Sequence, residues 1–89
     1  MRAFITVIGK DTVGILAKVS SACAEFGVNI QEVTQSVLQD MFAMIMLVDI
    51  DKSSVPFDKL QNSLSALGDE TGLKIHIMHE DIFNSMHRI

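Results

Sequence analysis

Residues 41–50, MFAMIMLVDI, decide the fold of this 89-residue chain and contain its longest apolar run, residues 41–48. A strand of an open antiparallel sheet usually alternates between apolar and polar side chains, because one of its faces meets water. This stretch is apolar at almost every position, which is typical of a strand covered on both faces. We therefore expect a central strand, with the chain's own helices on one face and a second molecule on the other.

Successive side chains of a strand point to opposite faces, so the stretch 41–50 divides into two sets. One set is Met41, Ala43, Ile45 and Leu47, and the other is Phe42, Met44, Met46 and Val48. The sequence leaves open which of the two sets faces the partner molecule.

The N-terminal third of the chain predicts a strand, a loop and a helix. Residues 3–8 (AFITVI) are β-branched or aromatic and predict the first strand, which Gly9 ends. Asp11 or Thr12 can then cap a helix. Its apolar positions recur at helical spacing at Ile15, Leu16, Val19, Cys23 and Phe26. Gly27 is a natural stop for this helix.

The stretch on either side of residues 39–40 predicts a hairpin. Residues 28–38 (VNIQEVTQSVL) are polar and β-branched, which favours an edge strand with one face in water. Gln39 and Asp40 make a short turn into the apolar strand 41–50, so the two strands pair as neighbours.

The C-terminal half predicts a helix, a strand and a short final helix. A helix start is indicated at Ser53 or Ser54, with Pro56 in the first turn and Gly68 as the stop. Its apolar positions are Phe57, Leu60, Leu64 and Leu67. Residues 73–78 (LKIHIM) alternate as a half-exposed strand. Residues 80–88 predict an amphipathic helix whose apolar side chains are Ile82, Phe83, Met86 and, just beyond it, Ile89.

The order β–α–β–β–α–β predicts one α+β domain over residues 1–89, a ferredoxin-like sandwich. Its four-stranded antiparallel sheet carries two helices on one face, and a short C-terminal helix follows. The first and third strands lie at the centre of such a sheet, and these are the apolar strands of this sequence. Because a small domain cannot hide 48% hydrophobic residues, we also expect self-association into a homodimer or a higher homo-oligomer.

Composition excludes several classes of function. The net charge is −4 and the basic residues are scattered, which disfavours direct binding of nucleic acid. No stretch is apolar for long enough to cross a membrane, and no signal peptide is recognisable, so we expect a cytoplasmic protein. Cys23 is the lone cysteine and lies on an apolar helix face, as a buried thiol does. No catalytic constellation emerges, so no enzyme activity and no cofactor are expected.

The histidines do not favour a metal site. His76 and His79 would point to opposite faces of one strand, which is wrong for binding the same ion. A helix-end interaction explains His87 equally well. We therefore expect no bound metal.

Two motifs carry a resemblance to a known family. The loop GKDTVGIL, residues 9–16, resembles the first loop of ACT domains, and GVNI, residues 27–30, resembles the start of their second strand. The resemblance covers residues 2–79. The strand FAMIMLVDI is similar to the third strand of the glycine cleavage system transcriptional repressor, and the tail EDIFNSMHRI resembles that of stand-alone bacterial and archaeal ACT proteins.

The resemblance implies a regulatory module that binds a small molecule, usually an amino acid, near the first loop at a homodimer interface. Carried over by position, the ligand-binding candidates are Asp11, Gly14, Ile15, Leu16, Asn29 and Ile30. Unpaired backbone N–H groups at a helix start suit a carboxylate, and Asp11 suits an ammonium group. Lys10 and Val13 stand where relatives often carry Arg and Pro, so the identity of the ligand does not transfer. The alternative is a protein–protein interaction module without a ligand, which docks a possible protein partner through the sheet face and the C-terminal helix.

Overall fold

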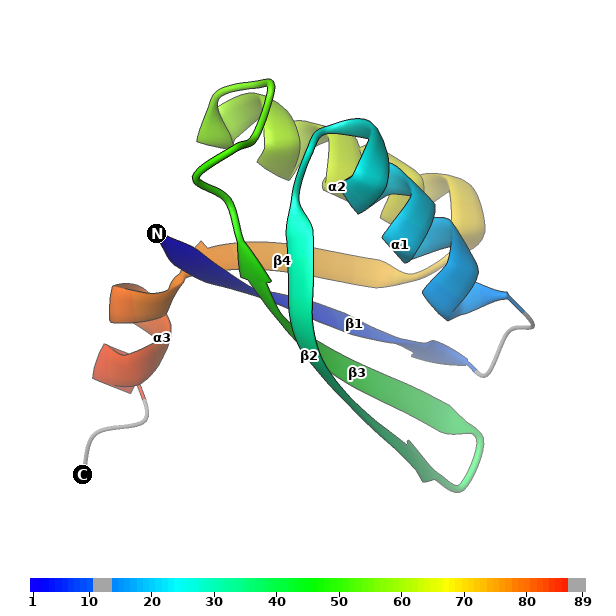
Figure 1. The fold of residues 1–89 in the computed structure, drawn as a ribbon. Helices are drawn as coiled ribbons and strands as arrows, with labels where there is room; N and C mark the ends of the chain where they lie inside the picture. Colours follow the sequence, from blue (N-terminus) through cyan, green and yellow to red (C-terminus); the bar gives the residue numbers. More distant parts are fainter. Residues whose placement is uncertain (11–13, 87–89) are drawn as a thin grey trace.

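The computed structural model describes residues 1–10 and 14–86, and within them it confirms the ferredoxin-like βαββαβ order (Figure 1). The elements are β1 (Arg2–Lys10), α1 (Ile15–Glu25), β2 (Asn29–Leu38), β3 (Met41–Asp49), α2 (Phe57–Thr71), β4 (Lys74–His79) and α3 (Glu80–Met86). The strands form one antiparallel sheet in the order β2-β3-β1-β4. The apolar strands β1 and β3 are therefore central, as predicted, and β2 and β4 are the edges.

Helices α1 and α2 lie on the same face of the sheet (Figure 1), and the hydrophobic core fills the space between the two layers. We call this face the covered face and the opposite face the open face. The covered face carries the set Phe42, Met44, Met46 and Val48, which are all at most 6% exposed. The other set of β3 side chains, from Met41 to Leu47, points to the open face. The structure thus shows which of the two sets faces away from the chain's own helices, and this is the set available to a partner.

Helix α1 begins later than a cap at Asp11 or Thr12 requires. Gly14 occupies the N-cap position in the left-handed conformation, with φ of 83°, and no described side chain caps the helix. Gly14 is thus the N-cap residue, and the predicted caps Asp11 and Thr12 lie outside the described residues. A positive φ is easy for glycine because it has no Cβ to clash. Within the described part of the chain, the backbone freedom of Gly14 is what allows the turn into the helix.

Helix α2 differs from the prediction at both ends. It begins at Phe57 with Pro56 at the N-cap, and the Ser53 hydroxyl instead bonds the carbonyl oxygen of Val55, 2.8 Å away, within the preceding loop. The predicted stop at Gly68 is also wrong, because the helix continues to Thr71 and Gly72 closes it with φ of 76°.

Gly68 is needed for packing rather than for stopping the helix. It is buried, and a Cβ built on it would lie 2.7 Å from the carbonyl oxygen of Leu73. The backbone N–H of Leu73 donates to the Gly68 carbonyl oxygen at 2.8 Å. The absent side chain lets the end of α2 approach the start of β4.

Helix α3 confirms the predicted C-terminal helix and packs on the open face at one end of the sheet. The ring of Phe83 stacks on that of Phe4 in β1, with the ring centroids 4.1 Å apart. Ile82 remains 53% exposed. The predicted positions His87, Arg88 and Ile89 lie outside the described residues.

Candidate functional site

The first group of predicted ligand residues lies at the start of α1. Gly14 is exposed, and a Cβ built on it would meet nothing within 4 Å, so the backbone is open to approach. Ile15 is 4% exposed and belongs to the core, whereas Leu16 is 38% exposed. Because Ile15 has its side chain in the core, it can offer a ligand only its backbone. Asp11 lies outside the described residues.

The second group lies where β2 begins. Asn29 is exposed, and Ile30 packs against the hydrophobic core. Asn29 borders a hollow of about 410 Å³ that is also lined by Gly27, Asp49, Asp51 and Lys52. An amide, carboxylates and an ammonium group therefore surround one small space.

These two groups lie at opposite ends of the sheet. Asn29 pairs with Asp49 of β3, whereas Lys10, the last residue before the first loop, pairs with Met41 at the other end of β3. At the usual rise of a strand, the β3 segment between those two positions is about 27 Å long. Figure 1 shows the same arrangement, because β2 begins at the end of the sheet far from the start of α1. One chain therefore does not bring the predicted residues together.

The carboxylates beside Asn29 hold the chain's own ammonium group. The amino group of Met1 forms an ion pair with Asp51 and lies 3.9 Å from Asp49. The hydrogen bond to Asp51 raises the pKa of this amino group above its ordinary value. Asp49 in turn accepts a hydrogen bond from the backbone N–H of Asp51 at 2.9 Å. Two carboxylates of this corner therefore lie close to one ammonium group, that of Met1.

Sequence reasoning missed Asp49, Asp51 and Lys52 as neighbours of Asn29. The only signal was the i, i+2 spacing of two carboxylates on one strand face, which at a turn usually means solvation. Their approach to Asn29 depends on the pairing of β2 with β3, which no local motif contains.

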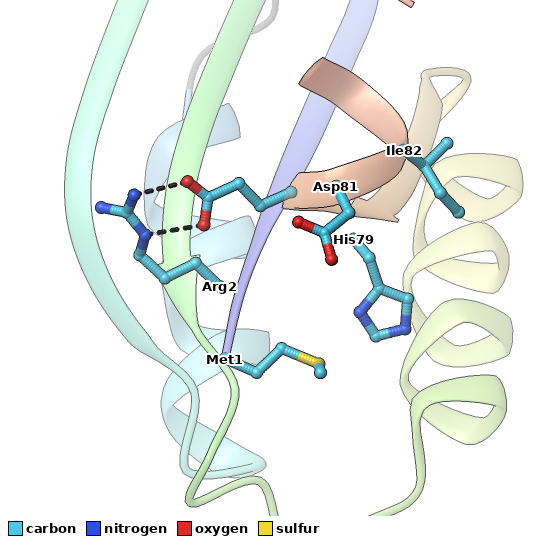
Figure 2. A pocket seen from close by; sticks show the side chains of 6 residues that line it. Met1, Arg2, His79, Asp81 and Ile82 are labelled. Carbon is cyan, nitrogen blue, oxygen red and sulfur yellow. Dashed lines mark hydrogen bonds and ion pairs between the residues drawn. The ribbon is translucent and has the colours of Figure 1, made fainter. Parts of the chain in front are cut away.

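A second hollow, of about 470 Å³, lies where β4 passes into α3 (Figure 2). It is lined by Met1, Arg2, His79, Glu80, Asp81 and Ile82. Arg2 and Glu80 form a two-point ion pair, with Nε to Oε2 at 2.9 Å and Nη2 to Oε1 at 2.5 Å. The hydrogen bond from Arg2 holds the pKa of Glu80 below its ordinary value. This ion pair links the start of β1 to the start of α3.

His79 is a packed histidine at the base of that hollow. Its ring stacks on Phe57 of α2, with the ring centroids 4.1 Å apart. Its Nδ1 is buried and finds no hydrogen-bond partner among the described residues. His76 is exposed on the other face of β4, as the sequence predicts. Over residues 1–10 and 14–86, no three His, Cys, Asp or Glu side chains come together in a metal-binding group.

Two further observations concern burial. Cys23 is a free thiol that is 0% exposed, and burial raises its pKa to about 11, as expected of a packed rather than a reactive cysteine. No described helix has both the length and the apolar character needed to span a membrane.

Comparison with known proteins gives one consistent family. The ACT domain model matches residues 2–78. A UPF0237 protein of Clostridium acetobutylicum is 51% identical over 89 residues, which cover 100% of both chains. Among solved structures, an ACT domain protein from Streptococcus pneumoniae superimposes with a TM-score of 0.82 at 42% identity, covering 93% of each chain.

The predicted similarity to a glycine cleavage repressor holds for the fold. A protein described as a transcriptional repressor of the glycine cleavage system superimposes with a TM-score of 0.72 at 24% identity. The match covers 86% of this chain and 44% of that one. The element order, the sheet order and these matches agree, and the chain belongs to the ACT domain family.

Proposed function

We propose that this protein is a regulatory sensor that binds a free amino acid between two copies of the chain, and that occupancy modulates a partner protein. The observation that carries the proposal is the separation of Gly14 from Asn29 along the sheet. If both contact one ligand, they must come from different chains. The family to which the chain belongs is a regulatory fold related to amino acid-sensing domains.

The exposed edge strand β2 offers a way to build such a site. All its side chains except Ile30 are exposed, and its outer edge carries no strand among the described residues. An unpaired edge is a template for another strand. If two copies pair antiparallel along β2 in full overlap, Asn29 of one copy lies beside Leu38 of the other. Leu38 lies at the end of the sheet where α1 starts, so each two-chain site receives Asn29 from one copy and the first loop from the other.

The combined site matches the groups of an amino acid. The start of α1 offers unpaired backbone N–H groups and a partial positive charge to a carboxylate. The Asn29 end offers an amide to an ammonium group. Asp49 adds a carboxylate, whose contact with the Met1 amino group, at 3.9 Å, is looser than that of Asp51, and Lys52 adds a cation. Because ligand binding needs both chains, it stabilises the dimer, and the sensor can report occupancy through its assembly state.

The alternative module, which would capture a partner through Phe83, is less well supported. Phe83 packs on Phe4 of its own chain, so it is not free to serve as the anchor for another protein. Its removal would first release α3 from the sheet.

A thermal-shift screen of the twenty amino acids at millimolar concentration tests the proposal. A ligand that binds the native state raises the melting temperature by mass action. We expect at least one amino acid to do so for the wild type and for Gln31→Ala, which changes an exposed neighbour on β2. Asn29→Ala should lose the response. If no amino acid raises the melting temperature, the proposal is wrong.

Mixing two defective variants tests whether the site is shared. Gly14→Asp places a negative charge at the carboxylate end, and Asn29→Ala removes the amide, so each homodimer should fail to bind. After both are mixed, half of the dimers are mixed and each has one intact site, which restores about a quarter of the wild-type sites. A site within one chain predicts no recovery on mixing.

A further inference from the structure

The hollow at the junction of β4 and α3 contains two polar groups without partners in the described part of the chain. His79, the last residue of β4, has a buried Nδ1 that accepts and donates no hydrogen bond there. A buried polar atom without a partner destabilises the folded chain. Asp81, two residues later on α3, is exposed, and its carboxylate forms no ion pair or hydrogen bond with another described residue. Both side chains line this hollow of about 470 Å³.

The other charged groups around the hollow are already engaged. Arg2 donates two hydrogen bonds to the carboxylate of Glu80. The amino group of Met1 pairs with Asp51, which does not line this hollow. The charge that remains is the negative charge of Asp81. The hollow therefore favours a cation, and its described lining residues hold no spare cation for an anionic ligand.

The rest of the lining is apolar and adaptable. The side chains of Met1 and Ile82 are 65% and 53% exposed. Figure 2 shows the imidazole of His79 between the carboxylate of Asp81 and the thioether of Met1. Because a methionine side chain is unbranched and flexible, it can move aside for a molecule that reaches Nδ1. An apolar lining with a few placed polar groups, in this range of volume, is typical of a small-molecule pocket.

We propose that this hollow binds a small organic amine with an apolar body. The ammonium group donates to the carboxylate of Asp81 and to Nδ1 of His79. This nitrogen is an acceptor when the imidazole is neutral and carries its proton on Nε2. The apolar body of the amine lies against the side chains of Met1 and Ile82. A free amino acid fits less well, because its carboxylate would lie near Asp81 without a cation to hold it.

A metal ion also fits these side chains less well than an amine. His79 and Asp81 supply one nitrogen and one carboxylate, and the carboxylate of Glu80 is held by Arg2. A bound zinc ion usually takes at least three protein ligands. Within residues 1–10 and 14–86, no group of three His, Cys, Asp or Glu side chains has a suitable arrangement.

Occupancy of this hollow is coupled to the position of α3. His79 belongs to β4, whereas Asp81 and Ile82 belong to α3, so one ligand bridges the two elements and stabilises the docked helix. The site goes beyond the proposed function, since neither Gly14 nor Asn29 lines this hollow. Failure of either proposal therefore leaves the other standing.

Titration of the full chain with phenethylamine, followed by nuclear magnetic resonance of the backbone amides, tests the proposal. Phenylalanine adds a carboxylate to the same body, and phenylpropionate replaces the amine by a carboxylate. We expect phenethylamine to shift the signals of residues 79–82 with a Kd of about 1 mM, the scale of a ligand this small. Phenylalanine should bind there at least fivefold more weakly, and phenylpropionate should not bind. Absence of shifts at residues 79–82, or equal binding of phenylpropionate, would overturn the proposal.

Two variants assign the polar contacts. Asp81→Asn keeps the shape and removes the charge, so the Kd for phenethylamine should rise at least fivefold. His79→Phe keeps an aromatic ring to stack on Phe57 and removes Nδ1, so the Kd should rise about threefold while the melting temperature does not fall. Asp69→Asn, the same charge removal on α2, and Asn29→Ala should leave the Kd unchanged. Wild-type affinity in Asp81→Asn, or loss of binding in Asn29→Ala, would show that the amine does not bind in this hollow.

Discussion

The two faces of this sheet are built from neighbouring residues of the same strand but differ in their exposure to solvent. Met46 is 0% exposed beneath the helices, and Ile45, one position earlier, is 40% exposed on the open face. The covered face is set by the fit between helices and sheet within one chain. The open face has similar apolar side chains, and among the described elements only α3 covers part of it. The comparison indicates that the apolar residues of β3 serve two different kinds of contact. One set packs within the chain, and the other set is left for contacts with a second molecule.

The sharpest way to break this comparison is to shorten both neighbours to alanine. Met46→Ala leaves a cavity in the core, so we expect it to lower the free energy of unfolding by about 2–5 kcal/mol. Ile45→Ala should cost less than about 1 kcal/mol in the dilute chain, because the side chain is already partly in water. Urea denaturation followed by circular dichroism measures both.

Protein concentration separates packing within the chain from packing between chains. If a second copy covers the open face, the cost of Ile45→Ala rises with protein concentration, because association stabilises the native state by mass action. The cost of Met46→Ala is set within the monomer and should change much less. If the two variants lose the same free energy of unfolding at low protein concentration, the two faces contribute equally to the stability of the monomer.

A smaller effect on the covered face tests the contact between α2 and β4. Gly68→Ala improves helix propensity by about 1 kcal/mol, yet its Cβ would clash with the backbone of Leu73. We expect a net destabilisation of about 1–3 kcal/mol, since overpacking against backbone cannot relax by a rotamer change. Thermal unfolding measures it, with Ala66→Gly on the exposed side of α2 as the control for propensity alone. A stabilised Gly68→Ala would show that the contact is not tight.

Gly68 also shows where prediction from sequence fails. The sheet order follows from the sequence because period and composition are local properties, and β1 and β3 are visibly the most apolar strands. A glycine after Leu67 has the same local appearance whether it stops a helix or admits a neighbouring backbone. The neighbour here is Leu73, which approaches only after the chain has turned. The tertiary contact, rather than the helix-stop signal, decides the outcome.

The candidate site also contains residues that the sequence can select and residues that only the tertiary structure reveals. Motif resemblance selects Gly14 and Asn29, and the structure places one at an open helix start and the other at the rim of a charged hollow. Asp49 and Lys52 could not be selected, because their place beside Asn29 depends on strand register. The distance between the two parts of the motif also follows from the topology, and this distance makes a site within one chain untenable if both parts bind the same ligand.

The smallest expected effect concerns the part of the open face that the chain covers itself. Arg2 holds the pKa of Glu80 below the ordinary 4.5 in the folded chain. Since the folded pKa is lowered, the ion pair contributes to α3 docking above pH 4.5, and the contribution is lost as the pH falls through the lowered value. The effect is small because both side chains meet solvent.

Nuclear magnetic resonance of the stacked rings of Phe4 and Phe83 measures this docking directly. In the wild type, we expect the ring shifts to move towards those of an undocked helix on acidification below pH 4.5. Arg2→Gln should shift the docking equilibrium at neutral pH and remove most of the pH dependence, whereas Asp69→Asn on α2 should change neither. If Arg2→Gln retains the full pH dependence, another carboxylate controls α3.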